Sequence, residues 1–303
     1  MHNTIRRYGC ITVLPLLALA GCDGDGDSGN VTAQSVVAVQ FLPEVNGTSF
    51  TCGANVPGVG SGTHDYMVDD FRFYIYDVHI NDSASGQSYT ITLDQDGTWQ
   101  LNNVAFIDLE NGCGAGTPEM NDAVTGTMDV PATVDLNDTE LCFTLGVPFD
   151  MNHIDEATAA SPMNASGMLW AWRNGRKFIR IDGVGDPGTA NQAFNLHLGS
   201  QGCSNTAGNA ALPPDSACTS PNTVEVCLAN FDLANDTVTV DPAPVLAATD
   251  ISLALGGAPG CQSFPNDDDC IEVMPRLGLD YSYGSASSTS AYAGDQLLFK
   301  KSP

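Results

Sequence analysis

Basic residues are scarce in this chain of 303 residues. It has 10 lysine and arginine residues against 36 aspartate and glutamate residues, which gives a formal net charge of −26 at pH 7. Phosphates of nucleic acids and anionic membrane surfaces repel a protein of this charge. We therefore expect no nucleic-acid partner.

Long apolar runs are missing as well. The most apolar stretch, Ile11 to Ala20, is too short to span a bilayer stably. It follows two arginines and ends in Leu19-Ala20-Gly21-Cys22, which resembles a bacterial lipobox. We expect residues 1–21 to be a lipoprotein signal peptide and Cys22 to be lipidated; a plain signal peptide cut nearby is the alternative. The chain is then exported and held by its acyl anchor at a bacterial membrane, facing the periplasm or the cell surface.

Catalytic and cofactor motifs are also absent. The sequence has no Gly-x-Ser-x-Gly elbow, no phosphate-binding loop, no haem-attaching Cys-x-x-Cys-His and no His-x-x-x-His. No repeat with a period of 20 to 50 residues is present. We expect a binding protein and not an enzyme, although an enzyme that uses histidines as acid and base is an open alternative.

Short alternating runs of apolar and polar residues, separated by many of the 31 glycines and 17 prolines, predict an all-β fold. We expect a disulfide-stapled β-sandwich or a partly open barrel, with long loops and at most one or two short helices. Residues 22–35 are predicted to be a flexible acidic tether and residues 36–303 a single β domain. The best helix candidate is Val245 to Leu255. The predicted strands include 36–41, 71–80, 89–93, 104–109, 124–130, 141–147, 224–228 and 237–240.

Eight cysteines remain after the signal peptide and the lipidated Cys22, and an even number in an exported chain predicts four disulfides. Eight cysteines allow 105 pairings. Ligation of a soft metal by thiolates is the alternative. We prefer the pairs Cys52 with Cys113, Cys142 with Cys227, Cys203 with Cys218 and Cys261 with Cys270.

The segment from Gly146 to Cys203 concentrates the residues that could form a site. It holds His153 and His197, and imidazole is a common ligand for copper, zinc and iron. It also holds the pair Trp170 and Trp172. His79 and His64 lie outside this segment and are the first and the second reserve ligand.

Asn174-Gly175 is a strong signal for a two-residue β-hairpin turn. It predicts strands over about 167–173 and 176–182, with Trp170 opposite Ile179 and Trp172 opposite Lys177. Four basic residues fall on this hairpin: Arg173, Arg176, Lys177 and Arg180. They are interpreted either as charge compensation on a solvated hairpin or as a positive surface that steers an acidic partner.

Each of these features also has an ordinary structural explanation. A single histidine is more often a hydrogen-bonded structural residue than a metal ligand. Tryptophans on strands are often core or sheet-surface residues. A metal-free surface β-sandwich that binds a ligand or another protein is therefore the alternative function.

Several segments carry a family resemblance in the same order along the chain. They are Asp69 to Tyr74 with Asp77-Val78, Gly146 to His153, Met168 to Trp172, Lys177 to Asp182, His197 to Cys203, Cys218 to Asn222, Gly260 to Ser263 and Asp269-Cys270. They resemble the MbnP family of methanobactin-associated copper-binding proteins, also called metallo-mystery-pair four-cysteine proteins, which are related to the methanotroph copper proteins CorA and MopE. The Cys142 and Cys227 pair and the strong acidity depart from the familiar pattern.

The resemblance implies a periplasmic or surface protein that holds one copper ion, expected as Cu(I). It also implies a partner, a di-haem cytochrome c peroxidase of the MauG type, which oxidises the first tryptophan of the Trp-x-Trp pair to kynurenine. By position that residue is Trp170. We choose His153 and His197 as the copper ligands, with oxidised Trp170 as a further ligand or as an organiser beside them, and with Trp172 packed next to it.

Overall fold

The computed structural model describes residues 32–113, 119–171, 173–209, 211–255, 257–281 and 292–303. The predicted signal peptide, the lipidation site Cys22 and most of the tether lie outside the described residues, and so does Trp172. The first strand begins at Thr32, so the last four residues of the predicted tether belong to the folded domain.

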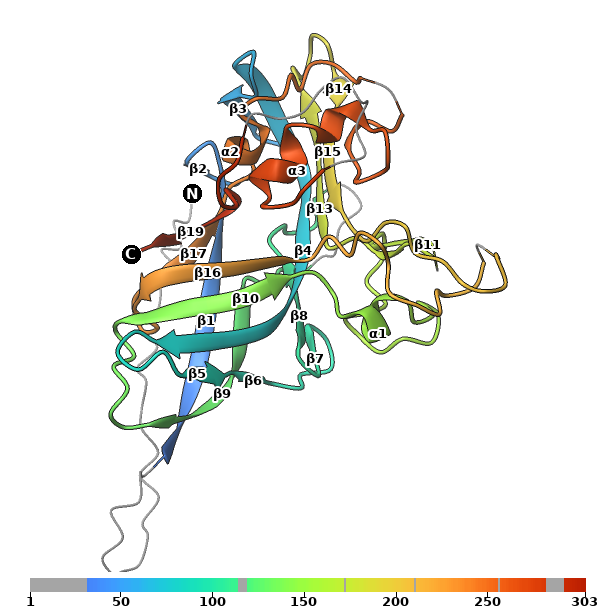
Figure 1. Cartoon of the computed structure of the whole chain (residues 1–303). Coiled ribbons are helices and arrows are strands. Elements are labelled where there is room, and N and C mark those ends of the chain that lie inside the picture. Colours follow the sequence, from blue (N-terminus) through green and yellow to red (C-terminus); the bar gives the residue numbers. More distant parts are fainter. Residues whose placement is uncertain (1–31, 114–118, 172, 210, 256, 282–291) are drawn as a thin grey trace, which may run out of the picture.

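Two β-sheets make up most of the molecule (Figure 1). The smaller sheet has the order β19-β17-β1-β9-β6, with β2 added at β1. Its strands are β1 (Thr32–Val45), β2 (Thr48–Ser49), β6 (Thr92–Leu93), β9 (Ala123–Pro131), β17 (Thr237–Val240) and β19 (Phe299–Ser302).

The larger sheet is built around the long strand β4, which runs through most of the molecule in Figure 1. The sheet has the central order β16-β10-β4-β13-β15-β18. Its strands are β3 (Asn55–Val59), β4 (His64–Asp82), β5 (Ser88–Thr90), β7 (Gln100–Leu101), β8 (Val104–Asp108), β10 (Thr139–Leu145), β13 (Ile179–Gly185), β14 (Gln192–Ala193), β15 (Asn195–Leu198), β16 (Val224–Phe231) and β18 (Gly260–Cys261).

The two sheets pack face to face through aromatic side chains. The ring of Phe41 in β1 lies 5.6 Å from that of Phe73 in β4 and 5.8 Å from that of Phe143 in β10, centroid to centroid. Phe299 in β19 contacts the same two rings at 5.4 and 5.2 Å. Edge-to-face contacts of this kind stabilise a core beyond the area they bury. The expected all-β sandwich is confirmed, and the described strands close no barrel.

The helices are short and differ from the expectation. Each α-helix spans four residues, and there are three of them in the described chain where one or two were expected: α1 (Phe149–Asn152), α2 (Ala243–Leu246) and α3 (Val273–Arg276), besides the 3-10 turn η1 (Asp268–Cys270). The helix predicted over Val245 to Leu255 is wrong for most of its length. The chain turns at Thr249, whose carbonyl accepts the amide of Ser61, and then at Asp250.

All four expected disulfides are present, namely Cys52–Cys113, Cys142–Cys227, Cys203–Cys218 and Cys261–Cys270. Cys142 and Cys227 face each other on the neighbouring strands β10 and β16, as their positions in two strand-like runs suggested. Disulfides in this number are typical of an exported chain. Among the described residues, no helix is long and apolar enough to cross a membrane.

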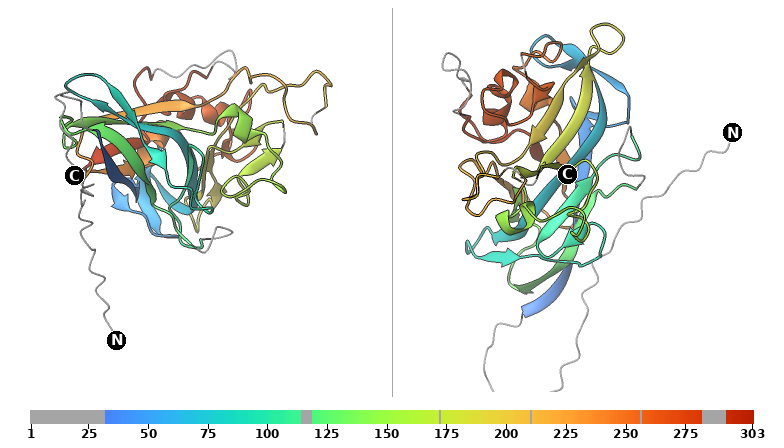
Figure 2. Two further views of the ribbon diagram at one scale, coloured as in Figure 1. Left: turned by 90° about the horizontal axis from the view of Figure 1, so that it is seen from below. Right: turned by 90° about the vertical axis from the view of Figure 1, so that its right-hand side faces the viewer.

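The outer face of the large sheet is covered as well as its core face. Residues 70–75 of β4 are all buried, with Phe71, Phe73 and Ile75 on the core side and Asp70, Arg72 and Tyr74 on the other. The cover on that other side is the segment 149–178, which carries α1 and the short pair β11 (Leu169–Ala171) and β12 (Gly175–Arg176). This segment projects from one side of the molecule (Figures 1 and 2).

Candidate metal centre

A row of charged side chains crosses the covered face of the large sheet. In register, Asp108 of β8 pairs with Arg72 of β4, Arg72 with Arg180 of β13, and Arg180 with His197 of β15. The residues on either side of these along each strand are apolar and point into the sandwich core. Alternation along four neighbouring strands therefore gathers these polar groups in one place.

Two arginine–carboxylate pairs fix this row. Arg72 donates to both oxygens of Asp70 at 2.7 and 2.5 Å, and Arg180 donates twice to Asp182, at 2.9 and 2.6 Å. The Nε of Arg180 also lies 3.1 Å from Asp70 and so links the two pairs. Pairs of this geometry hold planar groups in one orientation, which makes the row a rigid base.

His197 lies at the end of the row and is held by Asp182. Its Nε2 lies 2.5 Å from Oδ1 of Asp182, and the side chain is buried. Although burial opposes ionisation of Asp182, hydrogen bonds from His197 and Arg180 and the charge of Arg180 outweigh it and lower the pKa of that carboxyl. Asp182 is therefore an ionised acceptor, and Nε2 of His197 carries the proton.

Nδ1, the other ring nitrogen of His197, is in a state that can bind a metal ion. Burial lowers the pKa of His197 despite the neighbouring Asp182, so the ring is neutral near pH 7. Its Nδ1 is buried and has no hydrogen-bond partner among the described residues. A neutral imidazole that donates from one nitrogen to a carboxylate and presents the lone pair of the other is the usual state of a histidine that ligates a metal.

Trp170 in β11 lies beside His197, with ring centroids 6.4 Å apart. Its indole crosses directly over Gly199, where a Cβ atom would lie 2.5 Å from Cζ3 of the indole. A side chain at position 199 would therefore displace Trp170. On its other side Trp170 packs on the ring of Phe264, at 5.3 Å between centroids.

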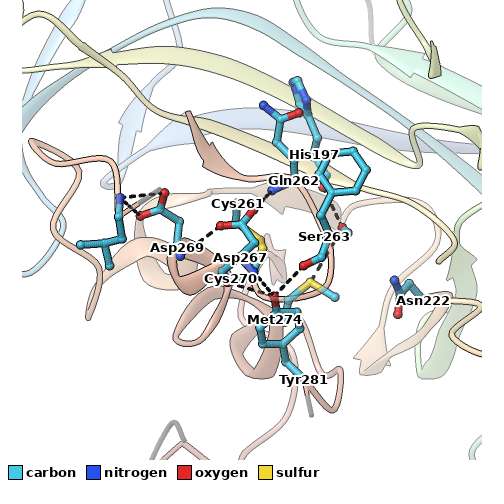
Figure 3. Close-up of a disulfide and its surroundings, with 12 residues drawn as sticks. His197, Asn222, Cys261, Gln262, Ser263, Asp267, Asp269, Cys270, Met274 and Tyr281 are labelled. Carbon is cyan, nitrogen blue, oxygen red and sulfur yellow. Dashed lines mark hydrogen bonds between the residues drawn. A yellow bond between two sulfur atoms is a disulfide. The ribbon is translucent and has the colours of Figure 1, made fainter. Parts of the chain in front are cut away.

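The Cys261–Cys270 loop brings Phe264 to this place. The strand β18 pairs with β15 in parallel, and the hydroxyl of Ser263 donates to the carbonyl of His197 at 2.8 Å (Figure 3). The carboxylate of Asp267 accepts the amide of Gln262 at 3.1 Å and so closes the loop on itself. The backbone of His197 and the ring that packs on Trp170 are thus tied to one disulfide-closed loop.

His153 follows α1 and is buried against the Cys203–Cys218 disulfide. Its Nε2 lies 3.3 Å from Nδ2 of Asn152 and 3.7 Å from Sγ of Cys218. Asn152 also donates to the hydroxyl of Ser200, three residues beyond His197. His197 lies near the end of β15, and Asn152 ties the neighbouring His153 to Ser200 in the segment that follows this strand.

Two clusters of potential ligand atoms occur in the described parts of the chain. One consists of His153, Cys203 and Cys218, and the other of Glu140, Cys142 and Cys227, each with all ligand atoms within 4.8 Å of one another. In both, the two sulfurs are joined as a disulfide and are not thiolates. The predicted pair of His153 and His197 is not one of these clusters.

The reserve ligands are engaged elsewhere. His79 lies seven residues beyond Arg72 on β4, roughly 20 Å away at the rise of an extended strand, and its Nδ1 contacts the carbonyl of Asp77 at 2.9 Å. His64 sits between two carboxylates, 2.8 Å from Asp186 and 3.1 Å from Asp250. The structure brings neither of them to the neighbourhood of Trp170.

The predicted hairpin is wrong in its register. β11 pairs with β12 through Leu169 opposite Arg176 and Ala171 opposite Gly175, so the turn is longer than the two residues expected. The following strand, β13, leaves the hairpin and pairs with β4 and β15. Trp170 is therefore not opposite Ile179, and the expected pairing of Trp172 with Lys177 falls on Trp172, which lies outside the described residues.

The predicted positive surface is also wrong for most of its members. The guanidinium of Arg176 is buried and donates to the carbonyls of Met151, Asn152, Ile154 and Met163. Lys177 donates to the carbonyl of Gly167 at 2.9 Å, and burial followed by the charge of Arg180 lowers its pKa to about 8. Arg180 is paired with Asp182, which leaves Arg173 as the exposed member.

Comparison with known proteins places the chain in a family. A family model for MbnP matches residues 34–263, more than half of the sequence. The chain belongs to the MbnP family. Among solved structures, MbnP from Methylosinus trichosporium matches with a TM-score of 0.73 and 29% sequence identity, over 88% of this chain and 98% of that one. No curated protein matches the chain.

Three residues of this candidate site were not predicted from the sequence. Asp182 was part of a matching segment, and its spacing of two from Arg180 placed both on one face of a strand, but its bond to His197 depends on the β13–β15 register. Asn152 precedes His153 directly and still gave no signal, since its role is set by contacts across the fold. Phe264 had no signal at all, because the loop that carries it pairs with β15 only in the folded chain.

Proposed function

We propose that the chain is an exported copper-binding protein whose metal centre is formed around His197, with residue 170 beside it. Membership of the MbnP family supports an association with copper. The chain binds the ion and does not turn over a substrate.

The observation that carries the proposal is the buried Nδ1 of His197, which lacks a hydrogen-bond partner in the described structure while Nε2 is bound to Asp182. A buried polar atom without a partner costs about 1–3 kcal/mol. Bonding to a metal removes that cost. Imidazole nitrogen suits copper, and the absence of thiolates at this position suits a chain from an oxidising compartment.

His153 is the proposed second ligand. Support comes from its burial and from the bond of its neighbour Asn152 to Ser200, which ties α1 to the segment that begins at His197. Two imidazoles and few other donors favour Cu(I), which accepts low coordination numbers. Copper in this setting is held by neutral ligands, with the charge of Asp182 as the nearby compensation.

Trp170 is the proposed site of oxidation by a partner di-haem peroxidase of the MauG type. The indole is half-buried and packed between Gly199, His197 and Phe264. Conversion to kynurenine replaces a ring N–H, which only donates hydrogen bonds, with an aniline amine and a ketone. The ketone and amine can ligate copper or orient a ligand, and the packing around residue 170 holds them next to His197.

The proposed location is a bacterial membrane, with the folded domain facing the periplasm or the cell surface and a lipid on Cys22. The sequence Leu19-Ala20-Gly21-Cys22 and the disulfides support this location. Because the anchor is an acyl chain, the domain itself needs no membrane-binding surface.

The experiment is co-production of the chain with and without the partner peroxidase, followed by metal analysis and mass spectrometry of the tryptic peptide that contains Trp170. Oxidation to kynurenine adds about 4 Da, from the loss of one carbon and the gain of one oxygen. We expect one copper per chain and the heavier peptide only with the partner. Copper bound equally to the unmodified chain would separate binding from oxidation, and no copper in either sample would favour a metal-free binding domain.

A further inference from the structure

The Cys203–Cys218 disulfide differs from the other three in its surroundings. An imidazole is buried against it, with Nε2 of His153 3.7 Å from Sγ of Cys218. Asn152 points its amide nitrogen at the same Nε2, 3.3 Å away, and an amide N–H donates only to a lone pair. The lone pair of His153 therefore lies on the side of the ring that faces the sulfur.

The backbone keeps these two cysteines together independently of the S–S bond. Gln201 and Ser220 exchange two hydrogen bonds, with N to O distances of 2.8 and 3.1 Å, and Thr219 donates to Gly202. Cys203 and Cys218 each lie two residues from this isolated β-bridge. Cutting the S–S bond would leave both side chains beside His153, because the bridge still holds their backbones.

Within the described parts of the chain, none of the other three disulfides has an imidazole nitrogen within 4.8 Å of both sulfurs. Cys142–Cys227 has a carboxylate, that of Glu140, as its neighbouring ligand group, and carboxylates suit hard cations rather than soft ones. The groups drawn around Cys261–Cys270 include Asp267, Asp269 and the hydroxyl of Tyr281 (Figure 3). In the described structure, this disulfide belongs to no cluster of three potential ligand atoms within 4.8 Å of one another. His153 with Cys203 and Cys218 is the arrangement that combines imidazole nitrogen with two sulfurs.

We propose that Cys203, Cys218 and His153 form a second, redox-gated site for a soft metal ion such as Cu(I). A dithiol reductant opens the site: the S–S bond breaks, two S–H bonds form with two electrons and two protons from the dithiol, and the dithiol closes its own disulfide. The soft cation then displaces both thiol protons and is held by two thiolates and Nε2 of His153.

This site shares His153 with the centre around His197 but needs neither His197 nor residue 170. In the oxidised chain His153 serves the copper centre proposed above, and in the reduced chain it has two thiolates as stronger competitors for the same ion. Reduction therefore moves the preferred position of copper toward Cys203 and Cys218. Phe149, which is 42% exposed, packs on the His153 ring at 5.0 Å between centroids.

The test is an anaerobic titration of the reduced and desalted chain with Cd²⁺, a soft ion without redox chemistry of its own, read by thiolate-to-metal charge-transfer absorption. We expect the Cys203→Ser/Cys218→Ser variant to lose one tightly bound equivalent relative to the wild type. The matched Cys142→Ser/Cys227→Ser variant keeps that equivalent. His153→Ala keeps the absorption band and weakens binding at least tenfold.

A single variant tests the site without any reductant. Cys203→Ser leaves Cys218 as a free thiol beside His153 while the other three disulfides stay closed, and Cys142→Ser leaves Cys227 as the matched control. We expect Cd²⁺ to bind more tightly to the first than to the second, and adding His153→Ala to the first to remove the difference. Equal binding in the two single variants, or no effect of His153→Ala, would overturn the proposal. Copper content of the oxidised chain is measured separately and bears only on the centre at His197.

Discussion

Replacing Asp182 with asparagine changes the surroundings of His197 without removing the imidazole. The Nε2 proton keeps an acceptor, but the negative charge that raises the basicity of the ring is lost. Such partners of metal-bound histidines typically contribute 10- to 100-fold to metal affinity. We expect Asp182→Asn to weaken Cu(I) binding by a factor in this range and His197→Ala to abolish it, measured by competition with a chromophoric Cu(I) chelator.

His79→Ala is the control for this prediction, because His79 is hydrogen-bonded to the backbone of Asp77 far along β4. It should bind copper as the wild type does. Circular dichroism shows whether each variant is folded, which matters for Asp182 because it is also paired with Arg180. If the folded His197→Ala variant binds Cu(I) as tightly as the wild type, His197 is not a copper ligand.

Arg176 and Arg173 look alike in the sequence and differ in the structure. Arg176 is 1% exposed and spreads its donors over four carbonyls, an arrangement that the three donors of a lysine on a flexible stem cannot copy. Arg176→Lys should lower the free energy of unfolding by about 3 kcal/mol, since carbonyls are left buried without donors. Arg173→Lys should change it by less than about 0.5 kcal/mol. Equal denaturation midpoints in urea for the two variants would contradict this.

At the scale of strands, the alternation of apolar residues predicted most of the sheet. Phe71 to Ile80 falls within β4, Val124 to Val130 within β9 and Thr237 to Val240 coincides with β17. The Asn174-Gly175 signal predicted the wrong strand pairing, because a turn motif carries no information about which strand the next part of the chain will pair with. After Arg176 the chain bends at Lys177 and Phe178, and β13 then pairs with β4 on one edge and with β15 on the other. A central strand of a large sheet is more stable than a strand of an isolated two-stranded hairpin.

Glu110, which follows β8, makes the free energy of unfolding depend on pH. Glu110 is fully buried, and burial followed by the charge of Asp108 raises its pKa to about 7, while the pKa in the unfolded chain stays near its usual value of about 4.3. Between those values the folded chain holds a proton that the unfolded chain has released. The stabilising contribution is therefore complete below about pH 4.3 and is lost as the pH rises to about 7.

The Glu110→Gln variant isolates this effect, because glutamine fills the same space and cannot ionise. We expect the difference in free energy of unfolding between Glu110→Gln and the wild type to grow in favour of the variant by about 1–3 kcal/mol from pH 4.5 to pH 7.5. Urea unfolding at both pH values measures it. A difference that stays constant with pH would show that folding does not raise the pKa of Glu110.

At the scale of the whole molecule, the fold was easier to predict than the site. Cysteine count, glycine-rich loops and alternating runs are properties of the chain itself, and they led to the sandwich and the four disulfides. The site depends on distant pairings: Ser263 bonds to His197 across 66 residues, and Phe264 reaches Trp170 through that contact. Sequence spacing carries no information about such contacts, so the choice of His153 and His197 rested on the chemistry of imidazole and on the family resemblance of the segments that hold them.

The net negative charge of the molecule comes mainly from carboxylates that are not part of the row of buried charged side chains around Arg72 and Arg180. Most of the described carboxylates are exposed or partly exposed, whereas Asp70 and Asp182 are matched by arginines on the covered face. The copper centre is therefore proposed to sit where local charge is balanced, within a protein of large net negative charge.

The most direct measurement is an anomalous difference map at the copper absorption edge from crystals of the copper-loaded chain. We expect one peak within bonding distance of Nδ1 of His197, with His153 and residue 170 at the same ion. A peak at His79 or His64, or no peak near His197 in a chain that contains stoichiometric copper, would contradict it.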